Sequence, residues 1–174
     1  MSRQLDGKHI ALLAENDYED IELHYPLLRL REEGAEITVV GPEVGRYQGK
    51  HGLSVEATRS AEQSAAEQFD ALVVPGGYCP DHLRTHEAVL ALVRGIDKAG
   101  KPLAAICHAP WVLCSAGVLG GRNVTSYSSI KDDVVNAGGI WHDKEVVIDR
   151  NLITSRFPPD LGVFCRAIIE ATAG

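Results

Sequence analysis

The stretch Lys101-Pro102-Leu103-Ala104-Ala105-Ile106-Cys107-His108 runs from a short apolar segment directly into a cysteine and a histidine. A short apolar run with an abrupt end is typical of a buried strand. Similar runs occupy residues 9–14, 37–41 and 69–74, and apolar residues at helical spacing lie between them. Strands separated by helices need crossover connections, so the sequence predicts an α/β fold with a doubly wound, mostly parallel sheet covered by helices on both faces.

Helices and two hairpins complete the predicted pattern. Apolar residues at helical spacing predict helices from about Ile21 to Gly34, from about Asp81 to Ala99, through Val112 and Leu113, from Ser129 to Ala137, and from about Asp160 onward. Glycines among polar residues predict an exposed hairpin over residues 45–58 at the edge of the sheet. A second hairpin is predicted over residues 145–156, turning at residues 149–151.

Length and charge exclude several classes of protein. The chain has 174 residues, 45% of them hydrophobic, which predicts a single domain over residues 1–174. Its 17 Lys and Arg against 24 Asp and Glu give a net charge of −7, so no nucleic-acid partner is expected. The sequence has neither a long apolar run nor a secretory leader, so we expect no membrane partner and a cytoplasmic location.

The chain has four cysteines, at positions 79, 107, 114 and 165, with no C-x-x-C pair and no zinc-finger spacing. In a reducing compartment they are expected to be free thiols. His82 and His86 stand four residues apart, a spacing that can bind zinc, but no third ligand is evident beside them. No phosphate-binding glycine motif occurs either, so neither a metal nor a cofactor is expected.

Cys107 is the strongest candidate for a nucleophile. It follows an apolar strand and precedes a helix, as in a nucleophile elbow, where a tight turn exposes the side chain. A helix N-terminus would also lower the pKa of its thiol. His108 could supply a backbone N–H and an imidazole for proton transfer. The alternatives are a small residue packed at the end of the strand for Cys107 and an ordinary exposed histidine for His108.

Two further segments follow predicted strands. Gly76 and Gly77 could let backbone N–H groups approach a developing oxyanion, although a simple turn is the more common meaning of such a pair. Acidic residues gather between Glu15 and Glu22, where a solvated helix start is the ordinary explanation. If one of these carboxyls is buried beside Cys107, it would be protonated and would donate a hydrogen bond to the thiolate.

Several segments together resemble the PfpI family, the intracellular-protease and deglycase branch of the ThiJ/PfpI superfamily. They match in order between about residues 8 and 172, and the most specific of them are residues 18–26, 74–78, 104–110, 120–127, 132–133 and 136–138. The resemblance implies a flavodoxin-like fold. The related glutamine amidotransferases need a histidine near the C-terminus, and residues 155–160 contain none.

The resemblance assigns roles to individual positions. Cys107 matches the family nucleophile, and Glu22 matches the carboxyl that hydrogen-bonds it, with Glu19 as an alternative. Gly76, Gly77 and the N–H of His108 match the oxyanion and substrate-binding region. Tyr127 matches a tyrosine that lines the pocket.

Asp81 departs from the family pattern. At the matching position, family members use a glutamate from the neighbouring subunit to orient the catalytic histidine. The resemblance therefore implies a homodimer or larger homo-oligomer with Asp81 near the interface. An aspartate is one methylene shorter than a glutamate, which puts its contact with His108 in question.

The implied function is a cofactor-free, stress-response hydrolase in which the Cys107 thiolate attacks an aldehyde or a glycated carbonyl. An intracellular cysteine peptidase would use the same nucleophile on a peptide carbonyl. A redox sensor that only oxidises Cys107, and a binding or chaperone-like module without chemistry, are the alternatives outside the enzymes.

Overall fold

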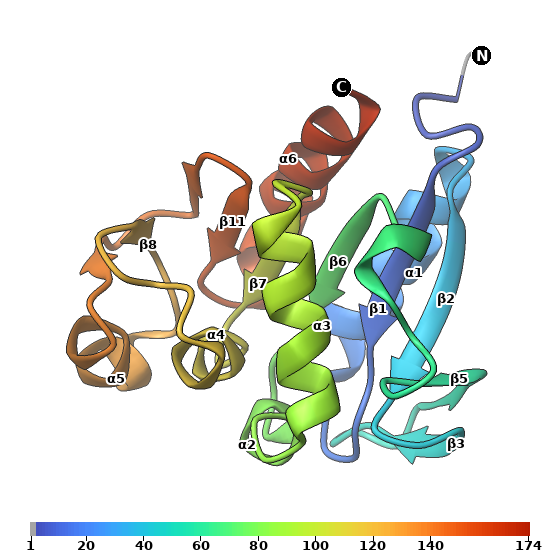
Figure 1. Cartoon of the computed structure of the whole chain (residues 1–174), viewed down its shortest axis with the longest axis horizontal. Helices are drawn as coiled ribbons and strands as arrows, with labels where there is room; N and C mark the ends of the chain where they lie inside the picture. Colours follow the sequence, from blue (N-terminus) through green and yellow to red (C-terminus); the bar gives the residue numbers. More distant parts are fainter. Residues whose placement is uncertain (1–2) are drawn as a thin grey trace.

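The computed structural model describes residues 3–174 and is built on a seven-stranded sheet (Figure 1). The strand order is β10-β11-β7-β6-β1-β2-β5, and β10 is the one antiparallel strand of this sheet in residues 3–174. The strands are β1 (His9–Leu13), β2 (Glu36–Gly41), β5 (Arg59–Ser60), β6 (Ala71–Val74), β7 (Leu103–Ile106), β10 (Val146–Asp149) and β11 (Leu152–Ser155). The five longest parallel strands follow the 2-1-3-4-5 order of a flavodoxin-like sheet, which confirms the predicted fold class.

Helices cover both faces of this sheet. Helix α1 packs against α6 on one face, and α3 packs against α4 on the other (Figure 1). The α-helices are α1 (Asp20–Glu32), α2 (Cys79–Leu83), α3 (Glu87–Lys98), α4 (Pro110–Ala116), α5 (Lys131–Asn136) and α6 (Leu161–Ala173), and the 3-10 turns are η1 (Ala66–Gln68), η2 (Ser128–Ile130) and η3 (Pro158–Asp160). Strands β6 and β7 are buried along their whole length, as expected of parallel strands covered on both sides.

The predicted hairpin over residues 45–58 is present, but it stands apart from the main sheet. Strands β3 (Gly45–Gln48) and β4 (Ser54–Ala57) pair with each other and pack beside β2. The edge position expected for the hairpin belongs to β5. The short parallel pair β8 (Asn123–Val124) and β9 (Ile140–Trp141) was not predicted, because two residues are too few to give a periodic signal.

The predicted helix from Asp81 to Ala99 is wrong as a single helix, because the chain breaks it into α2 and α3. The Thr85 hydroxyl donates to the carbonyl of His82, and His86 is extended with φ −99° and ψ 110°. A threonine side chain that bonds to a nearby carbonyl offers the backbone an alternative to the helix. No helix within residues 3–174 is long and apolar enough to cross a bilayer.

Candidate active site

The candidate site lies at the carboxyl ends of β1, β6 and β7. Strand β1 pairs with β2 on one side and β6 on the other, so the strand order reverses at this point. Ligands of open α/β sheets bind in the crevice at such a reversal. A pocket of about 350 Å³ opens there, lined by Glu19, Glu22, Lys50, Gly77, Tyr78, Cys107, His108, Tyr127, Phe157 and Pro158.

Cys107 occupies a strained turn between β7 and α4. Its φ of 64° lies in the left-handed region, which is uncommon for residues other than glycine. Two backbone hydrogen bonds hold this conformation: the Cys107 N–H donates to the carbonyl of Ser155 at 3.0 Å, and the N–H of Tyr127 donates to the carbonyl of Cys107 at 2.9 Å. The side chain is held at the pocket and is only 8% exposed.

Glu22 is fully buried on α1 and lies beside the Cys107 thiol. Its Oε2 accepts a hydrogen bond from the N–H of Gly76 at 2.8 Å, whereas its Oε1 has no hydrogen-bond partner among residues 3–174. Gly76 sits directly between the two side chains, since a Cβ at this position would overlap both Glu22 Oε2 and Cys107 Cβ. The carboxyl and the thiol are therefore close enough to compete for one proton.

Burial raises the pKa of the Glu22 carboxyl to about 8. Burial, together with the negative charge that Glu22 carries when ionised, also raises the pKa of the Cys107 thiol, although the N–H groups of Gly77 and His108 oppose this shift. The expected lowering of the thiol pKa by a helix N-terminus is thus wrong, because α4 begins only at Pro110 and burial has the larger effect. A thiolate is favoured when Glu22 is protonated, since the repulsion between them is then absent.

We expect the stability of the protein to depend on pH through Glu22. The folded-state pKa of about 8 lies above the ordinary value of 4.5, so the folded chain binds more protons than the unfolded chain between these two pH values. The contribution of Glu22 is thus fully present below pH 4.5 and is lost as the pH rises to about 8. Glu22→Gln removes a titrating group, so its free energy of unfolding should fall less over this range. Denaturant unfolding of both proteins at several pH values checks this, and parallel pH profiles would contradict it.

His108 completes the contacts of Cys107. Its Nδ1 lies 3.2 Å from the Cys107 sulfur, and its ring is stacked on Tyr127 with centroids 5.1 Å apart. Trp111 meets the same ring edge-on. Burial, with a smaller contribution from the Lys50 ammonium, lowers the pKa of His108, so the imidazole is neutral at neutral pH and can accept a proton.

The glycines after β6 fit the expected oxyanion site. Gly77 has a φ of 85°, and a Cβ there would overlap the backbone of Asp17, Tyr18 and Glu19. The N–H groups of Gly77 and His108 both approach the Cys107 sulfur from the backbone. Two amides that converge on a nucleophile are suitably placed for the negative charge that develops beside it.

The hairpin supplies a pocket residue that the sequence did not indicate. Lys50, in the turn between β3 and β4, donates to Glu19 Oε2 at 3.0 Å and is the cation among the residues that line the pocket. Buried Asp20 holds this turn in place by accepting hydrogen bonds from the N–H groups of His51 at 2.9 Å and Leu53 at 2.8 Å. The acidic residues between Glu15 and Glu22 indicate that hydrogen-bond donors lie near them, but no pattern in the sequence identifies residues 49–53 as those donors.

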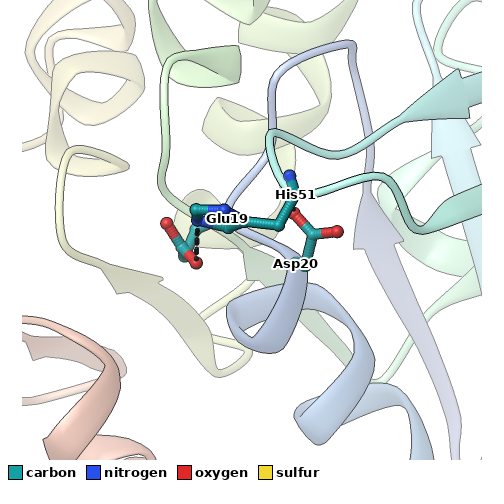
Figure 2. A group of neighbouring side chains, drawn as sticks. All are labelled: Glu19, Asp20 and His51. Carbon is teal, nitrogen blue, oxygen red and sulfur yellow. Dashed lines mark hydrogen bonds and ion pairs between the residues drawn. The ribbon is translucent and has the colours of Figure 1, made fainter.

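Figure 2 shows Glu19, Asp20 and His51, whose ligand atoms lie within 4.8 Å of one another. This spacing would suit a metal ion, but the carboxylate oxygens already have donors. Asp20 accepts the two backbone amides of the turn, and Glu19 pairs with Lys50 and, at 3.4 Å, with His51. An ammonium beside the cluster also disfavours a second cation. The group therefore serves to fix the hairpin against α1.

The structure brings together most of the predicted site residues and leaves one outside. Glu19, Glu22, Gly77, Cys107, His108 and Tyr127 line one pocket, with Gly76 behind it. Asp81 is exposed near the start of α2. Within the same chain, Nδ1 of His108 contacts Cys107 and Nε2 contacts Ser129, so neither of these contacts involves Asp81.

A cysteine on a strained strand-to-helix turn, with a buried carboxyl beside it at the reversal point of a flavodoxin-like sheet, defines a class of proteins whose chemistry centres on one thiol. Residues 8–171 match the model of the DJ-1/PfpI family. The chain belongs to this family.

Individual relatives agree with this assignment. The chain is 46% identical over 161 residues to Deglycase PH1704 of Pyrococcus horikoshii, covering 92% of this chain and 97% of that protein. It is 40% identical over 167 residues to Protein/nucleic acid deglycase 2 of Escherichia coli, covering 94% and 97%. Among solved structures, DJ-1beta of Drosophila melanogaster superposes with a TM-score of 0.89 at 34% identity, covering 96% of this chain and 91% of that one.

Proposed function

We propose that the protein is a cysteine-dependent hydrolase that acts on small aldehydes or on glycated carbonyl groups. The observation that carries this proposal is the placement of Cys107 between a buried carboxyl, a neutral imidazole and two converging backbone amides. The deglycase names of close relatives support the same substrate class. We propose further that residues 1–174 act as one domain in the cytoplasm, where the four free cysteines would stay reduced.

The proposed reaction uses groups of the chain alone. The Cys107 thiolate adds to the aldehyde carbon of methylglyoxal, and the carbonyl electrons move to the oxygen, which the Gly77 and His108 amides stabilise. His108, which holds the thiol proton, gives that proton to the oxygen of the neighbouring carbonyl and takes the proton from the former aldehyde carbon. It then passes this second proton to the neighbouring carbon, which leaves a lactoyl thioester on Cys107. Water then displaces the thiolate and releases lactate. The sum is methylglyoxal plus water giving lactate and a proton.

The function is tested by incubating the purified protein with methylglyoxal and measuring lactate. We expect turnover by the wild type and none by Cys107→Ala. Equal turnover by the two proteins would overturn the proposal. Hydrolysis of a peptide without lactate formation would favour the peptidase alternative. Addition of one or two oxygens to Cys107 by dilute peroxide, again without turnover, would favour the redox sensor.

We also propose that the protein works as a homo-oligomer in which Asp81 of one subunit approaches His108 of the other. The support is the resemblance to the family and the exposure of Asp81, three residues after Tyr78, which lines the pocket and is 61% exposed. The two halves of such a site lie on different chains. They can therefore be supplied by different variants.

Mixing Cys107→Ala and Asp81→Asn subunits should restore activity that neither variant has alone. If the protein pairs at random as a dimer, roughly a quarter of the wild-type activity per subunit is expected, because half the dimers are mixed and each mixed dimer has one complete site. Lactate formation after co-refolding measures this. Mixtures no more active than Asp81→Asn alone would contradict a site shared between subunits, and each variant refolded alone is the control.

A further inference from the structure

We propose that Ser129 is a positioning residue, which holds the imidazole of His108 with a proton on Nε2 and with Nδ1 facing the Cys107 thiol. Only the kinetic part of this inference rests on the proposed function. The geometry behind it is a chain of two contacts, because Ser129 Oγ lies 3.1 Å from His108 Nε2 and His108 Nδ1 lies 3.2 Å from the Cys107 sulfur.

The hydroxyl of Ser129 suits both protonation states that the reaction needs. In the neutral imidazole, an N–H at Nε2 donates to Ser129 Oγ and leaves the lone pair of Nδ1 free to take the thiol proton. After that transfer, Nδ1 donates to the thiolate while Nε2 still donates to the same serine oxygen. The ring therefore need not turn during proton transfer.

The backbone ties Ser129 to the nucleophile. Ser129 lies in η2, which begins directly after Tyr127. The N–H of Tyr127 donates to the carbonyl of Cys107 at 2.9 Å. The N–H of Ile130 donates back to the carbonyl of Tyr127, and the Ile130 side chain is buried. Tyr127 also stacks on the His108 ring. One short segment thus fixes the plane of the imidazole and supplies the acceptor at its far nitrogen.

Other ionisable groups surround His108 and must be considered in any pH profile. Cys107 faces Nδ1, and Lys50 of the hairpin contributes to lowering the pKa of the ring. Glu19 and Glu22 of the α1 region and Tyr127 line the same pocket. Behind Trp111, Arg84 lies over the indole ring and Asp133 accepts its N–H. In residues 3–174, Ser129 is the hydrogen-bond partner of Nε2.

The test compares Ser129→Ala, which removes the acceptor, with Ser129→Thr, which keeps a hydroxyl. Ser128→Ala is the matched control. Ser128 is also exposed in η2, but the hydrogen bond to His108 is made by Ser129. Three measurements are made: nitrogen NMR of the His108 ring, the pH profile of Cys107 alkylation read by peptide mass spectrometry, and lactate formation from methylglyoxal.

In Ser129→Ala we expect a mixture of the two neutral tautomers, an altered alkylation profile, and a kcat about tenfold lower at unchanged KM, as the loss of one hydrogen bond allows. Ser129→Thr and Ser128→Ala should resemble the wild type. A wild-type tautomer in Ser129→Ala overturns the proposal, as does a tautomer that responds to Asp81→Asn and not to Ser129→Ala. If the wild type forms no lactate, the proposed function fails, and the NMR and alkylation results still decide the role of Ser129.

Discussion

Replacing Cys107 with serine is expected to lower lactate formation from methylglyoxal by about four orders of magnitude or more, because the hydroxyl is a far weaker nucleophile than a thiolate in the same place. Glu22 does not compensate for this loss. Burial of Glu22 raises its pKa to about 8, so at neutral pH it is mainly the acid form and a poor base for a hydroxyl. Steady-state kinetics of both proteins at matched concentration measures the loss.

Cys114→Ser is the control for this substitution. Cys114 is a half-buried thiol on α4. Its thiol donates to the carbonyl of Asp133, and Cys114 is not among the residues that line the pocket. We expect this variant to keep wild-type turnover. Both variants should also keep the wild-type melting temperature within a few degrees, since serine and cysteine differ little in size. Comparable losses in the two variants would mean that Cys107 has no special role.

The second large effect is expected for Gly77→Ala, which should destabilise the fold by about 2–5 kcal/mol, from left-handed strain and from overpacking together. Gly77 has a φ of 85°, and its added Cβ would overlap the backbone of Asp17, Tyr18 and Glu19. These are main-chain atoms, which cannot move aside as the end of a side chain can. The loop before α1 would have to shift, and the pocket with it. Denaturant unfolding measures the loss of stability, and Cys107 alkylation reports on the pocket.

Gly162→Ala is the matched control for the glycine substitution. Gly162 lies in α6, and a Cβ there would meet no atom within 4 Å. Alanine is favoured over glycine within a helix, by up to about 1 kcal/mol, so this variant should be as stable as the wild type or slightly more stable. A Gly77→Ala protein as stable as Gly162→Ala would show that the loop after β6 is not as tightly enclosed as its contacts indicate.

The main elements of the fold were predictable because each carries a local signal. Strands β1, β2, β6 and β7 are short apolar runs, and they lie within one or two residues of the predicted positions. The break between α2 and α3 was not predicted, since it depends on a threonine hydroxyl that turns back on a nearby carbonyl. The separate position of the hairpin was also missed, because it depends on Asp20 binding a turn about thirty residues away in the sequence.

The candidate site was predictable where a residue follows a strand. Cys107, Gly76 and Gly77 follow apolar runs, and Glu22 was named through the family resemblance. Lys50 and Ser129 were not expected at the site, because each reaches it from a segment with no periodic or motif signal. The direction of the shift in the pKa of Cys107 was wrong for a related reason, since burial is set by the whole fold and not by the residues next to the thiol.

The strained turn at Cys107 has a consequence for the order of synthesis. Its two restraining hydrogen bonds come from Tyr127 and Ser155, both of which leave the ribosome after the cysteine does. Until β11 has been made and has paired with β7, Cys107 lacks the restraint from Ser155 on its left-handed conformation. The fully restrained turn therefore forms only after translation has passed β11.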